Sequence, residues 1–322
     1  HPERVIFTFN ATHSLNLSIH CLLSPGDHVV TTLLEHNSVT RPLQSLKDVC
    51  GIEVTTLKPN SDGIITPEAV KSACQPNTRL VAIIHASNVT GTVQPVTEIG
   101  QVTQESGIPL LVDAAQTAGV LPIDFDDSHF DLLACAGHKG LLGPLGTGLL
   151  CVSSEMSEKL SPLMQGGTGT ESELPGQPQA LPAKFESGNH NVPGLVGLEA
   201  GLEEVLNRGV DQIRNHEQQL AQELRDRLSE VPCLNTHSLR GITEPLAVIS
   251  ITSELYDPQT IGTLLSQEFN IETRGGLHCA PGVHQWLGTL EKGGTLRLSL
   301  GPFTESQDIE DTLAAFRELH ST

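Results

Sequence analysis

The sequence predicts an α/β fold in which a large domain carries a mostly parallel sheet and a smaller α+β domain follows at the C-terminal end. Two observations lead to this fold class. The 322 residues suffice for two domains that each bury a core. Short apolar runs also alternate with helical patterns over the first half of the chain, which is the order of a parallel sheet covered on both faces. We expect the large domain over residues 1–200 and the small domain over residues 201–322.

The apolar runs of the large domain are uniform enough to be strands buried on both faces. The strands are expected at 4–10, 28–33, 79–87, 109–116 and 131–137, and 146–153 is a candidate antiparallel strand behind a glycine turn. Helical patterns cover residues 11–23 and 38–50, and a third begins near Pro95. Because the chain opens on His1-Pro2 and enters the first strand almost at once, we also expect an N-terminal segment to be missing.

Beyond the sheet the pattern changes. Residues 164–188 are rich in Gly, Pro and Ser and predict a long loop. Residues 192–231 have a helical pattern, and the small domain is expected to begin inside this long helix, near residue 200. The elements expected after it are strands at 246–251 and 295–300 and helices at 257–268 and 305–319.

Charge and cysteine content narrow the possible functions. The net charge of -20 disfavours nucleic acid and acidic membrane surfaces as partners. No apolar run is long enough for a membrane-spanning helix, and the start has no signal-peptide layout. The 7 cysteines contain no CxxC pair, which indicates free thiols in a reducing cytoplasm.

Polar side chains end most of the predicted strands. They are Thr12, Glu35 to Asn37, His85 to Asn88, Asp113 to Gln116, and the pair His138-Lys139. Ligands of open α/β sheets bind at the carboxyl ends of the strands, so this set indicates chemistry with a cofactor.

The type of cofactor follows from the glycines and the phosphate site. Neither a GxGxxG turn after a strand nor a GxxxxGK[ST] loop is present, and 143–148 and 166–170 are better explained as turns. The helix N-terminus at Ala11-Thr12 offers free N–H groups and a hydroxyl to one phosphate. One phosphate, a strand-end aspartate and a lysine in a turn suggest pyridoxal phosphate (PLP).

Six segments then show a family resemblance. EHNSVTRPL, HASNVTGTVQPV, LLVDAAQTAG, GHKGLLGP, RGGLHCAP and GTLRLSLG resemble, in this order, the signatures of the class V aminotransferase superfamily, in its cysteine desulfurase and selenocysteine lyase branch. The resemblance covers essentially the whole chain. It implies the PLP-dependent transferase fold type I and a homodimer whose sites are built from both subunits.

The resemblance also implies roles for single residues. Lys139 would be joined to the PLP aldehyde, and Asp113 would pair with the pyridine nitrogen, although a strand-end aspartate alone is often a helix cap. His36 would stack on the ring and shuttle protons. Asn88 would contact the ring oxygen and the substrate carboxylate region, and Gln116 the same oxygen.

Further residues would hold the phosphate of the cofactor and the carboxylate of the substrate. Ala11, Thr12 and His138 would hold the phosphate. Arg297 would clamp the substrate carboxylate.

Cys279 separates desulfuration from transamination, because only sulfur removal needs a thiol nucleophile. Arg274 and His278 beside it are expected to favour the thiolate. Two imidazoles and a thiol without a fourth ligand do not predict a metal site. The resemblance thus implies a cytoplasmic, PLP-dependent sulfurtransferase that converts L-cysteine to L-alanine, keeps the sulfur as a persulfide on Cys279 and passes it to a sulfur-acceptor protein.

Three alternatives stay open. Selenocysteine lyase uses the same residues, another class V aminotransferase-like enzyme uses most of them, and an inactive PLP-binding scaffold needs fewer. Two positions depart from the family pattern: Ala136 stands where relatives often have a phosphate-binding Ser or Thr, and Asn189 stands where a threonine would reach the neighbouring subunit's phosphate. Both departures weaken the expected hold on the phosphate.

Overall fold

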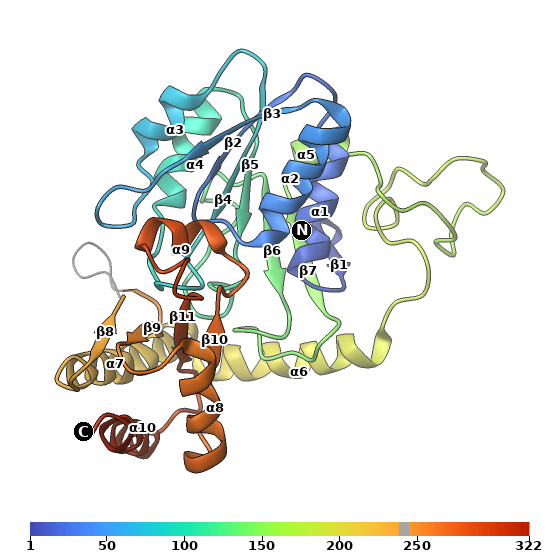
Figure 1. The fold of residues 1–322 in the computed structure, drawn as a ribbon. Helices are drawn as coiled ribbons and strands as arrows, with labels where there is room; N and C mark the ends of the chain where they lie inside the picture. The colour runs from blue at the N-terminus through green and yellow to red at the C-terminus, as the bar shows by residue number, and fades with distance from the viewer. Residues whose placement is uncertain (238–244, 322) are drawn as a thin grey trace. The chain divides into compact units, whose positions relative to one another are not determined.

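The computed structural model describes residues 1–237 and 245–321 of the chain (Figure 1). These residues form two compact units. Unit 1 comprises His1–Lys58, Ile65–His85 and Pro95–Val210, and unit 2 comprises Pro59–Ile64, Ala86–Gln94 and Asp211–Thr322. No helix in the described part of the chain is both long and apolar enough to cross a membrane.

Unit 1 is built on a seven-stranded sheet with the order β1-β7-β6-β5-β4-β2-β3. Its strands are β1 Val5–Thr8, β2 His28–Thr32, β3 Glu53–Leu57, β4 Thr78–Ile84, β5 Leu110–Asp113, β6 Leu132–Ala136 and β7 Gly148–Val152. The neighbours from β3 to β6 pair in parallel, and β7 runs antiparallel to both β6 and β1. The mostly parallel sheet and the antiparallel strand after the glycine turn are therefore confirmed.

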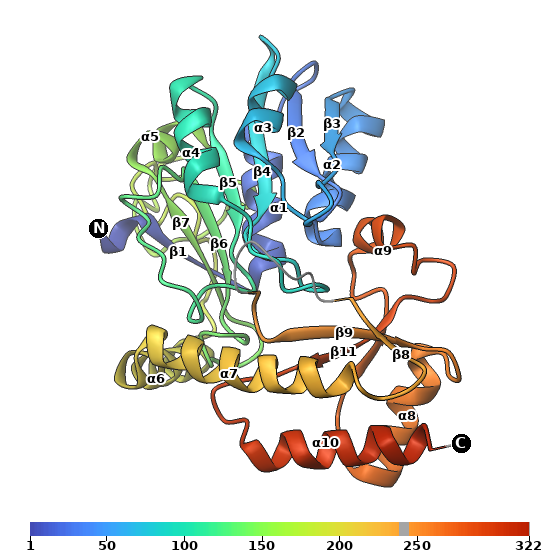
Figure 2. The same ribbon diagram turned by 90° about the vertical axis from the view of Figure 1, so that its left-hand side faces the viewer.

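The helices of unit 1 cover both faces of this sheet. They are η1 Pro2–Arg4, α1 Ala11–Leu22, α2 Asn37–Cys50, α3 Pro67–Ala73, α4 Val96–Glu105, α5 Ser154–Lys159 and α6 Val192–Arg208. α1 and α2 lie on one face, and α3 and α4 on the other (Figures 1 and 2). The expected long loop extends away from the sheet between α5 and α6, and it contains no helix or strand (Figure 1).

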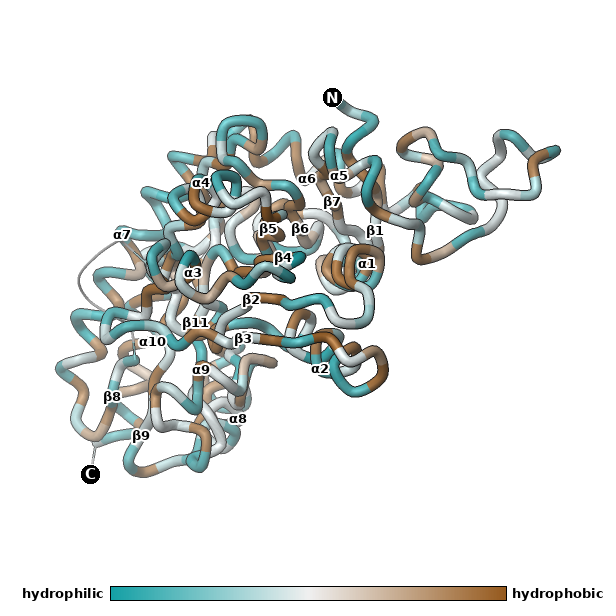
Figure 3. Tube along the Cα trace, turned by 90° about the horizontal axis from the view of Figure 1, so that it is seen from above, coloured by the Kyte–Doolittle hydropathy of each residue, from teal (hydrophilic) through white to brown (hydrophobic). Residues whose placement is uncertain are grey.

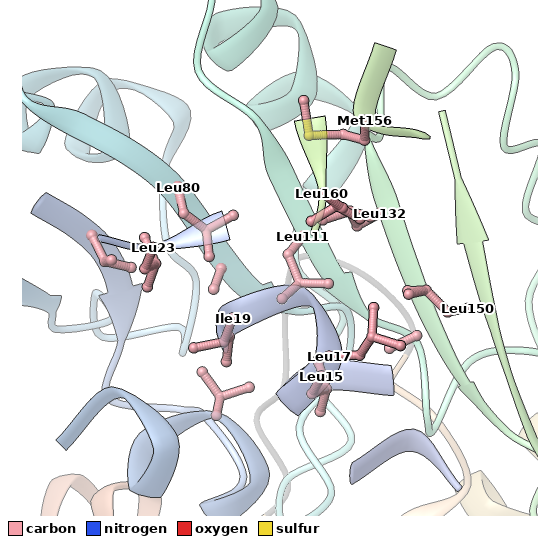
Figure 4. Packing of buried hydrophobic residues seen from close by; sticks show 14 of the residues in the cluster. Leu15, Leu17, Ile19, Leu23, Leu80, Leu111, Leu132, Leu150, Met156 and Leu160 are labelled. Atoms are coloured by element: carbon pink, nitrogen blue, oxygen red, sulfur yellow. The ribbon is translucent and has the colours of Figure 1, made fainter. Parts of the chain in front are cut away.

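The core of unit 1 explains why the sheet and α1 form together. β2, β5 and β6 are buried along their whole length, so their apolar side chains are removed from water on both faces. Leu15 and Ile19 of α1 pack with Leu111 of β5 and Leu132 of β6 in one cluster (Figure 4). The hydropathy of the trace shows the same pattern, with hydrophobic segments in β5 and α1 (Figure 3).

Unit 2 contains a four-stranded sheet with the order β10-β11-β9-β8, and all its pairs are antiparallel. Its elements are α7 Val210–Leu228, of which all but the first residue lie in unit 2, β8 Leu234–Thr236, β9 Val248–Ser253, α8 Pro258–Phe269, β10 Arg274–Gly276, α9 Pro281–Leu287, β11 Thr295–Ser299 and α10 Ser306–Leu319. α7, α8 and α10 pack on the sheet, with Leu224, Leu265 and Phe316 in one buried cluster. The expected α+β character of this part is confirmed.

One expected element is wrong in detail, and the edge strand β3 was not expected. The helical pattern over 192–231 is two helices, because Gly209 adopts a left-handed φ of 83° after α6 and ends that helix. β3 was not predicted, because it is an edge strand that pairs only with β2 and whose residues are exposed or half-buried. Its sequence EVTTL lacks the apolar run that marks the inner strands.

Candidate active site

The carboxyl ends of β2, β4, β5 and β6 lie at one edge of the unit 1 sheet, because these strands are parallel neighbours. Polar residues follow each of them, as the sequence predicts. Ile84 at the end of β4 is in register with Asp113 at the end of β5, and the His85 N–H donates to the Asp113 carbonyl at 2.9 Å. The structure thus places the strand-end side chains of unit 1 beside one another.

Asp113 is the buried anionic group of this edge. Its side chain is 4% exposed, and its Oδ1 accepts a hydrogen bond from the Ala115 N–H at 2.9 Å. Burial raises the pKa of the carboxyl, while that N–H and the charge of Lys139 act to lower it. Asp113 is therefore close enough to Lys139 to feel its charge, as expected if the two residues face the same cofactor.

Lys139 stands in a turn whose glycines are required by packing. A Cβ at Gly137 would lie 2.1 Å from the Thr147 hydroxyl oxygen, and a Cβ at Gly140 would lie 2.5 Å from the Ala118 carbonyl oxygen. The turn is closed by hydrogen bonds from Leu142 N to Lys139 O at 2.9 Å and from Gly143 N to Gly137 O at 2.7 Å. Close backbone contacts on both sides fix the lysine at the end of β6.

The N-terminus of α1 is the candidate phosphate site. Asn10 caps the helix by accepting from the His13 N–H, and Ala11 begins it. Ala11 contacts Ala115 and Ala136 in a cluster of three small buried side chains. These small side chains leave the first N–H groups of the helix close to the ends of β5 and β6, where an anion is favoured.

A chain of hydrogen bonds links Thr12 to His36. The Thr12 hydroxyl lies 2.7 Å from the Ser38 hydroxyl, which lies 2.8 Å from His36 Nδ1. The Ser38 N–H also donates to His36 Nδ1 at 3.1 Å, so the imidazole caps α2 through its unprotonated nitrogen. Nε2 then carries the ring proton.

The other expected cofactor residues of unit 1 lie at the same edge of the sheet. Gln116 is half-buried in the turn after β5, and His138 is exposed directly before Lys139. Burial and the charge of Lys139 lower the pKa of His138, so its imidazole tends to be neutral. Their expected contacts with PLP stay predictions.

Ser38 was missed as a functional candidate at this edge, and Glu35 was named among the strand-end residues without a role. Ser38 joins Thr12 to His36 and follows the EHN motif by one residue. Glu35 is 1% exposed, and its Oε1 accepts from the Thr32 hydroxyl at 2.7 Å and from the Ile84 N–H at 3.0 Å. Burial raises the pKa of Glu35 to about 8, and the charge of Asp113 acts in the same direction.

Unit 2 brings together a second set of expected residues. Asn88 belongs to this unit although it lies among the first 200 residues, because Ala86–Gln94 is part of unit 2. Its Nδ2 donates to the His278 carbonyl at 2.6 Å, and its own carbonyl accepts from Arg297 Nη1 at 3.1 Å. Asn88 Oδ1 and Arg297 Nε are buried and have no hydrogen-bond partner among the described residues, which leaves an acceptor and a donor for a polar ligand.

Cys279 is next to these residues in unit 2. Its Sγ accepts from Arg274 Nη2 at 3.6 Å, and Arg274 faces Arg297 across the β10–β11 pair. The guanidinium of Arg274 thus lies beside the Cys279 thiol, and the expected effect of this contact on the thiol stays a prediction. His278 cannot help through charge, since burial and the charges of Arg297 and Arg274, together with the neighbouring His284, lower its pKa to about 3.

Most of the remaining thiols are in different surroundings. All 7 cysteines are free. Burial raises the pKa of Cys21 to about 12 and raises the pKa of Cys74, Cys135 and Cys151 as well. Such thiols are poor nucleophiles, whereas Cys279 is only partly buried and contacts a guanidinium.

The two departures from the family pattern have clear surroundings. Ala136 is 2% exposed and packs on Ala11 and Ala115, so it offers no hydroxyl at the candidate phosphate site. Asn189 is exposed, and the neighbouring His190 pairs with Glu186 at 3.1 Å. Among residues 1–237 and 245–321, no group of three His, Cys, Asp or Glu side chains is placed to hold a metal ion.

These residues fit PLP. A buried carboxyl group lies at the end of β5, the charge of Lys139 acts on it, and the small side chains of Ala11, Ala115 and Ala136 leave room for a phosphate beside the start of α1. The unpaired acceptor of Asn88 and the unpaired donor of Arg297 are in turn suited to an amino-acid substrate. An open α/β sheet with such a site is typical of PLP-dependent enzymes.

Comparison with known proteins identifies the family. The model of the aminotransferase class-V family matches residues 1–312, so the chain belongs to this family of PLP-dependent enzymes. A probable cysteine desulfurase from Methanothermobacter thermautotrophicus is 33% identical over 313 residues, which cover 96% of this chain and 77% of that protein.

Two solved structures have the same fold. The apo structure of a cysteine desulfurase from Thermococcus onnurineus NA1 matches 100% of this chain and 80% of that chain with a TM-score of 0.92 at 29% identity. The crystal structure of the cysteine desulfurase CsdA from Escherichia coli matches 99% of this chain and 80% of that chain with a TM-score of 0.91 at 28% identity. The expected fold and the resemblance to the cysteine desulfurase branch are confirmed.

Proposed function

We propose that this protein is a PLP-dependent cysteine desulfurase that converts L-cysteine to L-alanine and retains the sulfur as a persulfide on Cys279. The contact between the Arg274 guanidinium and the Cys279 thiol carries the proposal, because transamination has no use for a partly buried thiol held beside a cationic group. The cysteine desulfurases among the relatives and solved structures support it.

The cofactor residues of unit 1 have the following roles in this proposal. Lys139 binds the PLP aldehyde and, once released by substrate, moves the proton at the substrate Cα. Asp113 holds a proton on the pyridine nitrogen, and when bound the cofactor supplies an electron sink that weakens the bonds at Cα. His36, whose Nε2 carries the ring proton, helps the proton transfer, while Asn88 and Gln116 bind the ring oxygen.

The anionic ends of the reactants are held by donors. The N-terminus of α1 at Ala11 and Thr12 holds the phosphate together with His138. In unit 2, Arg297 binds the substrate carboxylate, and its buried Nε supplies a donor for that contact.

The sulfur step is balanced without an outside oxidant. The Cys279 thiolate forms a bond to the substrate sulfur, and the Cβ–S bond of the substrate breaks. Its electron pair stays on the carbon side and a proton is added there, so that alanine leaves. The enzyme cysteine has then gained one sulfur atom as a persulfide, which a sulfur acceptor removes.

Variants of the PLP-loaded protein test this function. Cys279→Ser is expected to abolish alanine formation from L-cysteine, whereas Cys50→Ser leaves it unchanged. Lys139→Ala is expected to abolish it as well, together with the absorbance of the lysine-bound cofactor. If Cys279→Ser still releases alanine at the normal rate, the desulfurase assignment fails. If the protein reacts faster with selenocysteine than with cysteine and this reaction does not need Cys279, the protein is a selenocysteine lyase instead.

We further propose a cytoplasmic homodimer. The free state of all 7 cysteines supports the compartment. Large apolar side chains exposed on unit 1 support a contact with a second copy: Phe7 40%, Phe9 57%, Leu145 78%, Val192 61% and Val196 60%. Light scattering is expected to give twice the mass of 34.4 kDa, and a monomer would contradict the proposal.

A further inference from the structure

Cys279 lies in a tight turn with an unusual backbone. The turn runs from Leu277 to Ala280 and is closed by a hydrogen bond from the Ala280 N–H to the Leu277 carbonyl at 2.9 Å. Both central residues are left-handed, with φ of 51° at His278 and 59° at Cys279. Such a turn usually carries Asn and Gly, because other side chains are strained in this conformation. Something else must therefore hold the turn in place.

The His278 ring provides the first anchor. Its Nε2 lies 3.0 Å from the Thr295 carbonyl oxygen and 3.1 Å from the Thr295 hydroxyl. The Thr295 hydroxyl donates to Ser250, whose hydroxyl donates to the Val89 carbonyl at 2.7 Å. Nε2 is accordingly the donor, and the ring is tied to β11 and, through Ser250, to β9.

The His278 backbone provides the second anchor. Its carbonyl accepts from Asn88 Nδ2 at 2.6 Å, and the Asn88 carbonyl accepts from Arg297. The side chain is only 2% exposed, and burial, the charges of Arg297 and Arg274 and the neighbouring His284 keep the ring neutral by lowering its pKa. A neutral ring adds no positive charge beside Cys279, so it acts there through its hydrogen bonds.

We propose that His278 is a positioning residue, whose ring donor and backbone carbonyl hold the strained turn so that the Cys279 thiol stays at the Arg274 guanidinium. This inference rests on the proposed function and deepens it, because it explains how the thiol is kept ready for the substrate sulfur. Without the anchors, the turn is free to leave the left-handed conformation and the thiol to leave Arg274.

Steady-state kinetics of the PLP-loaded protein provide the first test. His278→Ala removes the ring donor and is expected to lower kcat for alanine formation at least about tenfold, while KM for cysteine changes less than about twofold. His278→Gln places an amide N–H near the position of Nε2 and is expected to restore most of kcat. A loss of kcat that His278→Gln does not restore would overturn the role of the ring donor.

A partial reaction shows whether the damage is local. Exchange of the α-proton of L-alanine in D2O needs Lys139 and the cofactor but not a thiol. We expect His278→Ala to keep this exchange at the normal rate. An equal loss of exchange and of alanine formation would mean general damage to the fold and would overturn the inference.

Alkylation separates this inference from the proposed function, since it needs no turnover. We expect Arg274→Gln to slow the reaction of Cys279 with iodoacetamide. Peptide mapping measures the alkylation of Cys279, with the Cys50 and Cys233 peptides as internal references. The same substitution in the His278→Ala background is expected to have no effect. Equal effects in both backgrounds would show that His278 does not hold the thiol at Arg274, whether or not the protein is a desulfurase.

Discussion

Glu35 shows how a single buried residue can make stability depend on pH. It is buried beside the end of β4, where it accepts from the Ile84 N–H, and burial and the charge of Asp113 raise its pKa from 4.5 to about 8. The folded state therefore binds a proton that the unfolded state has released, and stability must fall as the pH rises from about 4.5 to about 8. Each tenfold difference in proton affinity between the folded and unfolded states changes the free energy of unfolding by up to about 1.4 kcal/mol.

Glu35→Gln removes this dependence while keeping an oxygen for the Thr32 and Ile84 donors. Urea unfolding of both proteins at pH 5 to 8.5 is expected to show that the free energy of unfolding depends less on pH in the variant. The variant therefore becomes more stable relative to the wild type as the pH rises. Parallel profiles would mean that Glu35 is not protonated in the folded protein.

A positive charge alone is not enough to bind the substrate carboxylate at the position of Arg297. It donates to the Asn88 carbonyl through Nη1 and has a buried Nε left for a ligand, a fork that lysine lacks. We therefore expect Arg297→Lys to raise KM for cysteine about tenfold or more. The loss in kcat/KM is expected to come more from KM than from kcat. Initial rates over a range of cysteine concentrations measure both constants, and an unchanged KM would contradict carboxylate binding at this position.

At the scale of elements, the lysine turn after β6 depends on its glycines. An added Cβ at Gly140 would lie 2.5 Å from the Ala118 carbonyl and 2.8 Å from Val120 Cγ2, so the turn would have to move. Gly140→Ala is expected to cost about 1–3 kcal/mol and to lower the melting temperature.

The long loop offers a matched control for this substitution. Gly167 has nothing within 4 Å of an added Cβ, and Gly167→Ala is expected to leave the melting temperature nearly unchanged. Equal effects of the two substitutions in a thermal melt would refute the packing argument for the lysine turn.

The elements that the sequence predicts best are those that packing decides. The inner strands β2, β5 and β6 are buried along their length and are therefore continuous apolar runs in the sequence. The edge strand β3 has no such run, and the break at Gly209 follows from one backbone conformation rather than from a pattern.

In the candidate site, too, local sequence patterns predict some residues, whereas others depend on contacts between distant parts of the chain. The positions of Asp113 and Lys139 were predictable, because Asp113 ends one buried strand and Lys139 follows another, and both strands are apolar runs in the sequence. The tie between Asn88 and His278 was not, since it joins residues 190 positions apart in sequence. The role of Ser38 also depends on a contact between two helices, which no local pattern encodes. The expected domain boundary near residue 200 stays a prediction.

At the scale of the whole molecule, the net charge of -20 is a global destabilising force. Like charges on the surface repel one another in the compact state, and salt screens this repulsion. Raising the NaCl concentration from about 10 to about 150 mM, which shortens the Debye length to about 8 Å, is expected to raise the melting temperature. The same rise with KCl excludes a specific ion effect, and a fall in both salts would contradict the argument.

The proposed desulfurase activity depends on the bond between Lys139 and PLP. Borohydride reduction of the PLP-loaded protein fixes a lysine-bound cofactor irreversibly, and peptide mapping by mass spectrometry then locates it. We predict a single pyridoxyl phosphate adduct on Lys139, which Lys139→Ala abolishes. An adduct on another lysine, or none at all in protein that has bound PLP, would contradict the central claim.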